Sequence, residues 1–313
     1  MHVSALIKDY LFAIMRDDKD GVRQCQSFLN DPIPTVANCI EGDANDFHNA
    51  SVDLTRKQEF SFAYRLLEVG THKFPTDTDL LGDLLLYGLK CRSYTELEKY
   101  SDALLKLPKN VWTWRAFHFS IEYLMEGYEQ ADDTSRAVLE KKILGLLDDY
   151  KEHSKFFTDQ SDREKAYSLK HRFYMIKRDI PSALKTLQDA IDEIPGKCPQ
   201  CALRLADYYF DAGEYDKVIA PAECASLIIE VQPAISYSYL HFILGASREY
   251  ILRKSSKLLS EENVRPIYHS YYAALVYAED NDRKRHHNIK NRIRVLEYDS
   301  GIPSNIDFSQ FDD

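Results

Sequence analysis

Apolar residues recur at every third or fourth position through most of this chain, in segments that turn residues separate. This spacing places the apolar side chains on one face of an α-helix, whereas a half-buried strand needs strict alternation. In the clearest segment, residues 164–197, Asp179-Ile180-Pro181 interrupts the pattern, and Pro181 suits the first turn of a helix. The two helix faces are marked by Tyr167, Tyr174, Ala183, Leu187 and Ala190. We therefore predict two helices joined by a tight turn.

A second helix pair is predicted from Pro199 onwards. Its first helix ends near Gly213, because glycine turns the chain after a helix without a Cβ penalty. The faces of these two helices are marked by Leu205, Ala206, Tyr209, Val218, Ala222 and Ala225. No single pair buries its apolar face alone, so consecutive pairs are expected to stack and to share a core.

Prolines close three of the helical segments: Pro75, Pro108 and Pro195. From Pro75 to Pro108 the interval is 33 residues, close to the repeat length of paired helices, about 34 residues. A small residue lies five positions before each proline: Gly70, Ala103 and Ala190. Small residues at a fixed place in each unit let two helices approach closely.

On these residues, the segments 55–109 and 162–230 resemble the tetratricopeptide repeat. The repeats are degenerate, because Lys170 and His171 stand where the family has Leu-Gly. The resemblance implies an all-α fold, a solenoid of antiparallel helix pairs that winds into a right-handed superhelix. It also implies a non-catalytic role, in which the concave surface of the first helices binds a partner protein or peptide.

The repeat phase directs five side chains into this concave surface. They are Arg115, Arg172, Arg204, Asp207 and Phe210. Charged groups in a groove can hold a partner's carboxylates or backbone, and an aromatic ring can anchor it. The alternative for each charged residue is an ordinary ion pair on a helix surface, which contributes little to stability.

Three parts of the chain are expected to differ in organisation. Residues 1–50 form an irregular helical cap with a loop over 32–50, which is rich in Pro, Gly, Asn and Asp. Residues 51–298 form the repeat array, which closes with a long C-terminal helix within 264–298. Residues 299–313 contain a Ser-Gly-Ile-Pro stop and are expected to be a flexible acidic tail. The alternatives for its end, 306–313, are a short linear motif that docks elsewhere and a segment that folds back onto the basic last helix.

Composition narrows the classes of partner. The chain has 313 residues and a formal charge of −10 at pH 7, which disfavours nucleic acid and anionic lipid. The N-terminus lacks the uncharged apolar block of a signal peptide. The longest uncharged run, 231–247, is too short and too polar to span a bilayer. Six scattered cysteines do not form the dense framework of a small secreted domain, so we expect a cytoplasmic protein with reduced thiols and no membrane partner.

Cys198 and Cys201 form a Cys-x-x-Cys motif, which in other settings is redox-active or binds zinc. Redox motifs of this kind belong to a strand–helix context, and no strand is predicted. A structural zinc needs four ligands, and no second pair follows. The two cysteines are therefore weak metal candidates, and we expect them to pack as small buried residues. No cofactor is expected.

A basic segment over 283–294 stands out in this acidic chain. Its charged members are Arg283, Lys284, Arg285, Lys290, Arg292 and Arg294. They support an alternative function, a helical-repeat nucleic-acid-binding protein in which they contact phosphate, or else a patch for an acidic partner. The other interpretation takes Ile289, Ile293 and Leu296 as the buried stripe of a final helix. The charges then form the solvated outer face at the end of the array.

Motifs of catalysis are absent from the sequence. It contains no Gly-rich phosphate loop, no His-Glu-x-x-His, no Gly-x-Ser-x-Gly and no dinucleotide-binding fingerprint. We therefore predict that the chain is not an enzyme. The expected function is an adaptor or regulatory subunit, and one candidate partner is an enzyme that it regulates.

Overall fold

The structure is a computed structural model that describes residues 1–92, 94–156, 160–194, 198–227, 237–255, 259–278 and 283–311. The chain divides into two compact units, Met1–Phe156 and Phe157–Asp313. Over the described residues the regular structure is helical, and the one extended pairing in those ranges is an isolated bridge between His2 and Glu41. The predicted all-α fold class is confirmed.

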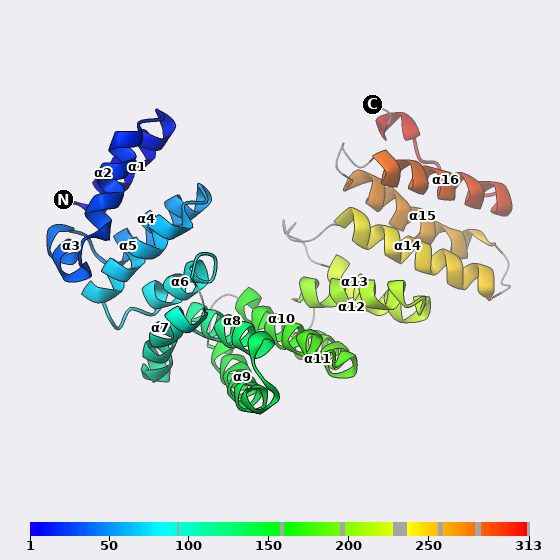
Figure 1. The fold of residues 1–313 in the computed structure, drawn as a ribbon. Helices are drawn as coiled ribbons and strands as arrows, with labels where there is room; N and C mark the ends of the chain where they lie inside the picture. The colour runs from blue at the N-terminus through cyan, green and yellow to red at the C-terminus, as the bar shows by residue number, and fades with distance from the viewer. Residues whose placement is uncertain are drawn as a thin grey trace. The chain divides into compact units, whose positions relative to one another are not determined.

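The first unit consists of helices that pair in chain order (Figure 1). Their bounds are α1 Val3–Met15, α2 Lys19–Asn30, α3 Ile33–Cys39, α4 Ala44–Arg56, α5 Phe60–Lys73, α6 Thr78–Gly88, α7 Tyr94–Lys106, the 3-10 turn Lys109–Val111, α8 Trp114–Gln130 and α9 Asp133–Ser154. Contacts join α1 to α2, α4 to α5, α6 to α7 and α8 to α9. Short turns connect the helices of each pair, so the two run antiparallel.

The second unit repeats this organisation (Figure 1). Its helices are α10 Gln160–Ile176, α11 Ile180–Glu193, α12 Pro199–Asp211, α13 Tyr215–Ser226, α14 Tyr237–Lys254, α15 Glu261–Val276, α16 Arg283–Ser300 and the 3-10 helix Phe308–Phe311. Contacts join α10 to α11, α12 to α13 and α14 to α15. The antiparallel helix pairs predicted from the sequence are confirmed. The right-handed superhelix stays a prediction.

The same turn closes the first helix of four pairs. One residue in each turn has a left-handed backbone: Asp17 (φ 54°), Gln58 (φ 64°), Arg178 (φ 58°) and Gly213 (φ +73°). The N–H of the next residue then donates to the carbonyl five positions back, with N···O distances of 2.9–3.0 Å. This is the Schellman geometry, which satisfies a carbonyl at the end of the helix. Gly213 ends its helix as predicted.

Close packing of the first helices depends on small residues. Gly82 of α6 faces Phe119 of α8, and a Cβ built on Gly82 would lie 2.2 Å from a ring carbon of Phe119. In the second unit, Ala190 is fully buried against the core of the helix pairs. Pro195, which the period also used, lies outside the described residues.

The loop predicted over 32–50 is wrong, because α3 and α4 occupy most of it. A proline in the first turn of α3 fits a helix start, where its missing N–H costs nothing. Asp43 and Asp46 form a capping box at α4, with backbone N–H to carboxylate distances of 2.9 and 3.0 Å. The polar residues that suggested a loop are helix caps.

The C-terminal predictions also need correction. In place of one long helix within 264–298, the described residues form α15 and α16. In place of a flexible tail, residues 301–309 lie against these helices: Tyr268 donates to the Ile302 carbonyl at 2.8 Å, and the Ser304 N–H donates to Glu297 at 2.7 Å. Ile302 and Phe308 pack against the core of α15 and α16. These apolar contacts order a segment whose acidic residues had suggested a flexible tail.

No helix in the described part of the chain combines the length and the apolar character needed to cross a membrane.

Candidate functional site

In the first unit, the first helices of three successive pairs each contribute one polar side chain to a connected row. His48 comes from α4, Asp83 from α6 and Arg115 from α8, and α6 contacts both α4 and α8. The imidazole Nδ1 of His48 hydrogen-bonds a carboxylate oxygen of Asp83, and Arg115 Nη1 lies 3.2 Å from His48 Nε2. All contacts are satisfied when Nδ1–H donates to Asp83 and Nε2 accepts from Arg115.

Burial fixes this row in place. Asp83 is only 2% exposed, and burial raises the pKa of its carboxyl group, while the interaction with His48 and the positive charge of Arg115 act in the opposite direction. Arg115 is half-buried and its guanidinium lies 5.6 Å from the ring centre of Trp114. The predicted groove residue Arg115 is thus held in one orientation by two neighbours.

The second unit has a similar row on α12, α14 and α16. The Tyr239 hydroxyl donates a hydrogen bond to Asp207, and the guanidinium of Arg285 lies 5.7 Å from the Tyr239 ring centre. Burial raises the pKa of Tyr239, and the hydrogen bond to Asp207 adds to that effect. The predicted groove residue Asp207 therefore belongs to an ordered polar row that crosses from one pair to the next.

Arg172 on α10 and Arg204 on α12 are both exposed. Burial lowers the pKa of His171, and the positive charge of the neighbouring Arg204 lowers it further. Burial also raises the pKa of the Glu164 carboxyl group, and the positive charge of Arg204 acts in the opposite direction. The placement of the two arginines in a concave groove stays a prediction.

Phe210 offers a partner only part of its ring, whereas the prediction made it an anchor in the groove. Its ring packs edge-on against Tyr215 and Phe242, with ring centres 5.5 and 6.3 Å apart. Part of its surface is thus used within the unit. Tyr208 on the same helix is 38% exposed, and the sequence analysis did not single it out.

Cys198 and Cys201 are fully buried. Burial raises the pKa of both thiols, that of Cys201 to about 12, and the negative charge of Glu164 acts in the same direction. The Cys201 N–H donates to Glu164 at 2.8 Å. No cluster of three or more metal-ligating side chains occurs in the described ranges. The two cysteines pack as small buried residues.

Most of the described basic side chains of α16 contact other residues of the same unit. Ile289, Ile293 and Leu296 form its buried stripe, as the alternative interpretation predicted. Lys284 is exposed, whereas Lys290 is only 9% exposed. The guanidinium groups of Arg285 and Arg294 lie over the rings of Tyr239 and Phe308, at 5.7 and 5.5 Å from the ring centres. Arg292 Nη1 lies 3.2 Å from a carboxylate oxygen of Glu249. The side chain of Arg283 lies outside the described residues. A phosphate backbone would have to compete with these partners.

His48, Asp83 and Tyr239 were not predicted from the sequence as site residues. The repeat period could have identified them. His48 and Asp83 are 35 residues apart in sequence, Asp207 and Tyr239 are 32 apart, and each pair is hydrogen-bonded across neighbouring first helices. Polar residues one repeat apart on the first-helix face are neighbours in space.

No protein-family model matches the chain, and no curated protein matches it. Among solved structures, it is similar to a tetratricopeptide repeat protein from Parabacteroides merdae, with 11% identity, a TM-score of 0.42 and coverage of 94% of this chain and 98% of that one. It is also similar to a circular tandem repeat protein with novel repeat topology and enhanced subunit contact surfaces, with 12% identity, a TM-score of 0.26 and coverage of 95% and 70%. These TM-scores are low, so the fold class rests on the helices and contacts of the chain itself. Over its described residues, the chain is an all-α protein of repeated antiparallel helix pairs.

Proposed function

We propose that this protein is a non-catalytic scaffold, an adaptor or regulatory subunit that binds a partner protein or peptide on the first-helix faces of its helix pairs. The observation that supports this most is the pair of polar rows, His48–Asp83–Arg115 and Asp207–Tyr239–Arg285. The first row spans three pairs, the second spans two pairs and the final helix α16, and each is held by contacts within its unit. A surface fixed before binding loses little entropy when a partner docks.

In the second unit the preferred partner segment is acidic. Arg172 and Arg204 are exposed on neighbouring first helices and supply guanidinium groups for carboxylates. Asp207 and the exposed part of Phe210 lie further along α12 and contact the backbone and an apolar side chain of the same segment. One class of partner that fits this role is an enzyme that the scaffold regulates.

The proposal places the protein in the cytoplasm. All six cysteines are free thiols, which agrees with a reducing compartment.

The test is affinity purification of partners from the native host, with the double variant Arg172→Glu and Arg204→Glu. We expect a partner that the wild-type chain enriches to be lost from this variant, while the circular dichroism spectrum shows that the helices remain folded. A matched control, Lys185→Glu with Lys217→Glu, makes the same charge change on the second helices α11 and α13 and should retain the partner. Retention of the partner by the arginine variant would refute the proposed surface.

A further inference from the structure

An apolar hollow of about 370 Å³ lies between α1 and α4 in the first unit. Its lining residues are Ser4, Ile7, Lys8, Leu11, Phe12, Met15, Asp46, Asn49, Ala50 and Asp53. Ile7 and Ala50 are buried and form its floor, with 4% and 6% exposure. The hollow is large enough to receive apolar side chains from a partner.

The edge of this hollow on α1 exposes large apolar side chains. Met15 is 76% exposed and Phe12 is 43% exposed, and both line the hollow. Ile14, next to Met15 in sequence, is 37% exposed. Grouped exposure of this kind marks interaction sites, whereas single exposed apolar residues need no explanation. Methionine side chains also adapt to differently shaped partners.

The opposite edge, on α4, is acidic. Asp46 and Asp53 are seven residues apart, so they lie on one side of the helix two turns from each other, with Asn49 between them. Their present cationic partners are weak, exposed pairs: Arg56 at 3.2 Å from Asp53 and His2 at 3.5 Å from Asp46. A partner's lysine or arginine can take the place of either.

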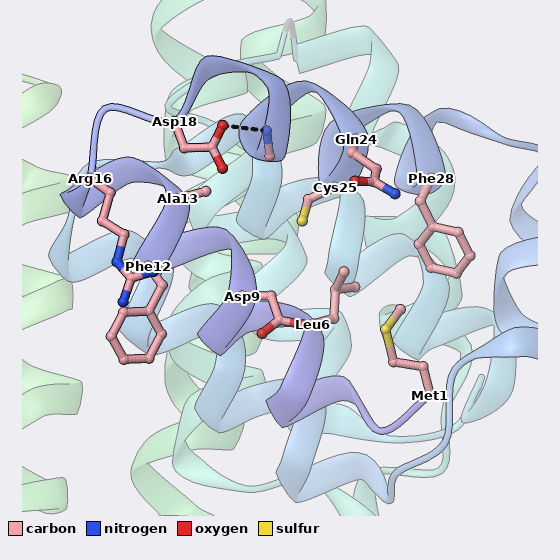
Figure 2. Close-up of a pocket in the computed structure, with 11 residues that line it drawn as sticks. Met1, Leu6, Asp9, Phe12, Ala13, Arg16, Asp18, Gln24, Cys25 and Phe28 are labelled. Carbon is pink, nitrogen blue, oxygen red and sulfur yellow. Dashed lines mark hydrogen bonds between the residues drawn. The ribbon is translucent and has the colours of Figure 1, made fainter.

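A second and larger hollow, about 600 Å³, lies between α1 and α2. Figure 2 shows Arg16 and Phe12 on one side of it and Cys25 and Phe28 on the other. Its charged groups carry both signs. The Asp18 carboxylate accepts the Gly21 N–H at 3.0 Å (Figure 2), as the Asp46 carboxylate of the first hollow accepts the Asp43 N–H at 2.9 Å. Each of the two hollows is lined by two acidic side chains and one basic side chain, which is Lys8 in the hollow between α1 and α4. In that hollow the two carboxylates lie together on α4, opposite the exposed apolar side chains of α1.

We propose that the hollow between α1 and α4 docks an amphipathic helix of a partner protein that carries Lys or Arg along one flank of its apolar face. The apolar residues of that helix, at spacings of three and four, fill the space beside Met15 and Phe12. Its basic flank lies against Asp46 and Asp53. The inference deepens the proposed scaffold function and assigns to the first unit a partner chemistry opposite to the acidic segment preferred by Arg172 and Arg204.

The probes are two fluorescein-labelled synthetic helices of about 16 residues, long enough to span four turns. They share one leucine face and differ only in their flanks, which carry lysine in one and glutamate in the other. Binding is measured by fluorescence anisotropy at physiological ionic strength. We expect the wild-type chain to bind the lysine peptide about tenfold more tightly, as two weak charge pairs supply. Equal affinity for both peptides would overturn the proposal.

Variants locate the binding site. Met15→Glu should weaken the lysine peptide about tenfold or more, because it places a charge in the apolar contact. Asp53→Lys should weaken the lysine peptide and strengthen the glutamate peptide. Val138→Glu, on an exposed position of α9 in the same unit, is the matched control and should change nothing. Unchanged binding by Met15→Glu and Asp53→Lys would contradict the assignment.

Two further results separate the alternatives. The variant Arg172→Glu with Arg204→Glu should bind the lysine peptide as the wild type does, so failure of the second-unit surface and failure of this hollow are distinguishable. Sedimentation velocity tests whether a second copy of the chain is the occupant. A concentration-dependent dimer that Met15→Glu dissolves would overturn the proposal in favour of self-association.

Discussion

Two neighbouring pairs in the second unit close their first helices with the same turn but different residues, and this predicts substitutions of opposite effect. Arg178 (φ 58°) and Gly213 (φ +73°) occupy equivalent left-handed positions. Replacing Arg178 by Gly should stabilise the unit, and replacing Gly213 by Ala should destabilise it. Both effects come from the backbone, because a Cβ on Gly213 would meet nothing within 4 Å and Arg178 is exposed.

The magnitude follows from two opposing quantities. A side chain in the left-handed region costs about 1–2 kcal/mol, and glycine loses about 0.5–1 kcal/mol more backbone entropy on folding. Arg178→Gly should therefore raise the unfolding free energy by about 0.5–1 kcal/mol. Gly213→Ala should lower it by about the same amount.

The assay is urea unfolding followed by circular dichroism at 222 nm, with thermal melting as a second measure. Arg178→Ala is the control, because it removes the same side chain and keeps a Cβ in the left-handed region; its free energy should stay within about 0.5 kcal/mol of the wild type. The reasoning would be refuted if Arg178→Gly and Gly213→Ala shifted stability in the same direction, or if Arg178→Ala stabilised as much as Arg178→Gly.

Three further outcomes are expected. Gly82→Ala should destabilise the first unit by about 1–3 kcal/mol, since its Cβ would overlap the Phe119 ring; urea unfolding measures this, and a neutral result would contradict the close approach. Cys201 should resist alkylation in the folded chain at pH 8 while the exposed Cys39 reacts, as mass spectrometry would show. Burial raises the pKa of Cys201 from its ordinary value of 9.0 to about 12, so the buried protonated thiol contributes stability below pH 9 that is lost as pH rises toward 12. Labelled RNA should show no gel shift at low salt, because most described cations of 283–294 have intramolecular partners; a salt-sensitive shift would instead support nucleic-acid binding.

The helix pairs were predictable from the sequence because each pair repeats local signals. The apolar spacing and the turn at Gly213 act within one or two helices, and local signals of this kind survive degenerate repeats. The helices α3 and α4 were missed because their caps, including Asp43 and Asp46, use the same residue types as loops. Residue identity alone does not separate a cap from a loop.

The polar rows were harder to predict, because each bond joins side chains from different repeats. His48 has no local sequence feature that points to Asp83, and Asp83 becomes distinctive only once the fold buries it. Arg115 was selected for its predicted face, and the structure adds the neighbours that orient it. Phe210 was selected in the same way, but its ring contacts depend on α13 and α14, which the pattern of its own helix does not reveal.

Hydrogen–deuterium exchange on the chain with its captured partner tests the central claim most directly. If the first-helix faces bind the partner, protection on binding should rise on first helices such as α10 and α12 and should not change on the second helices α11 and α13. Protection confined to α11 and α13, with α10 and α12 unchanged, would contradict the proposed surface.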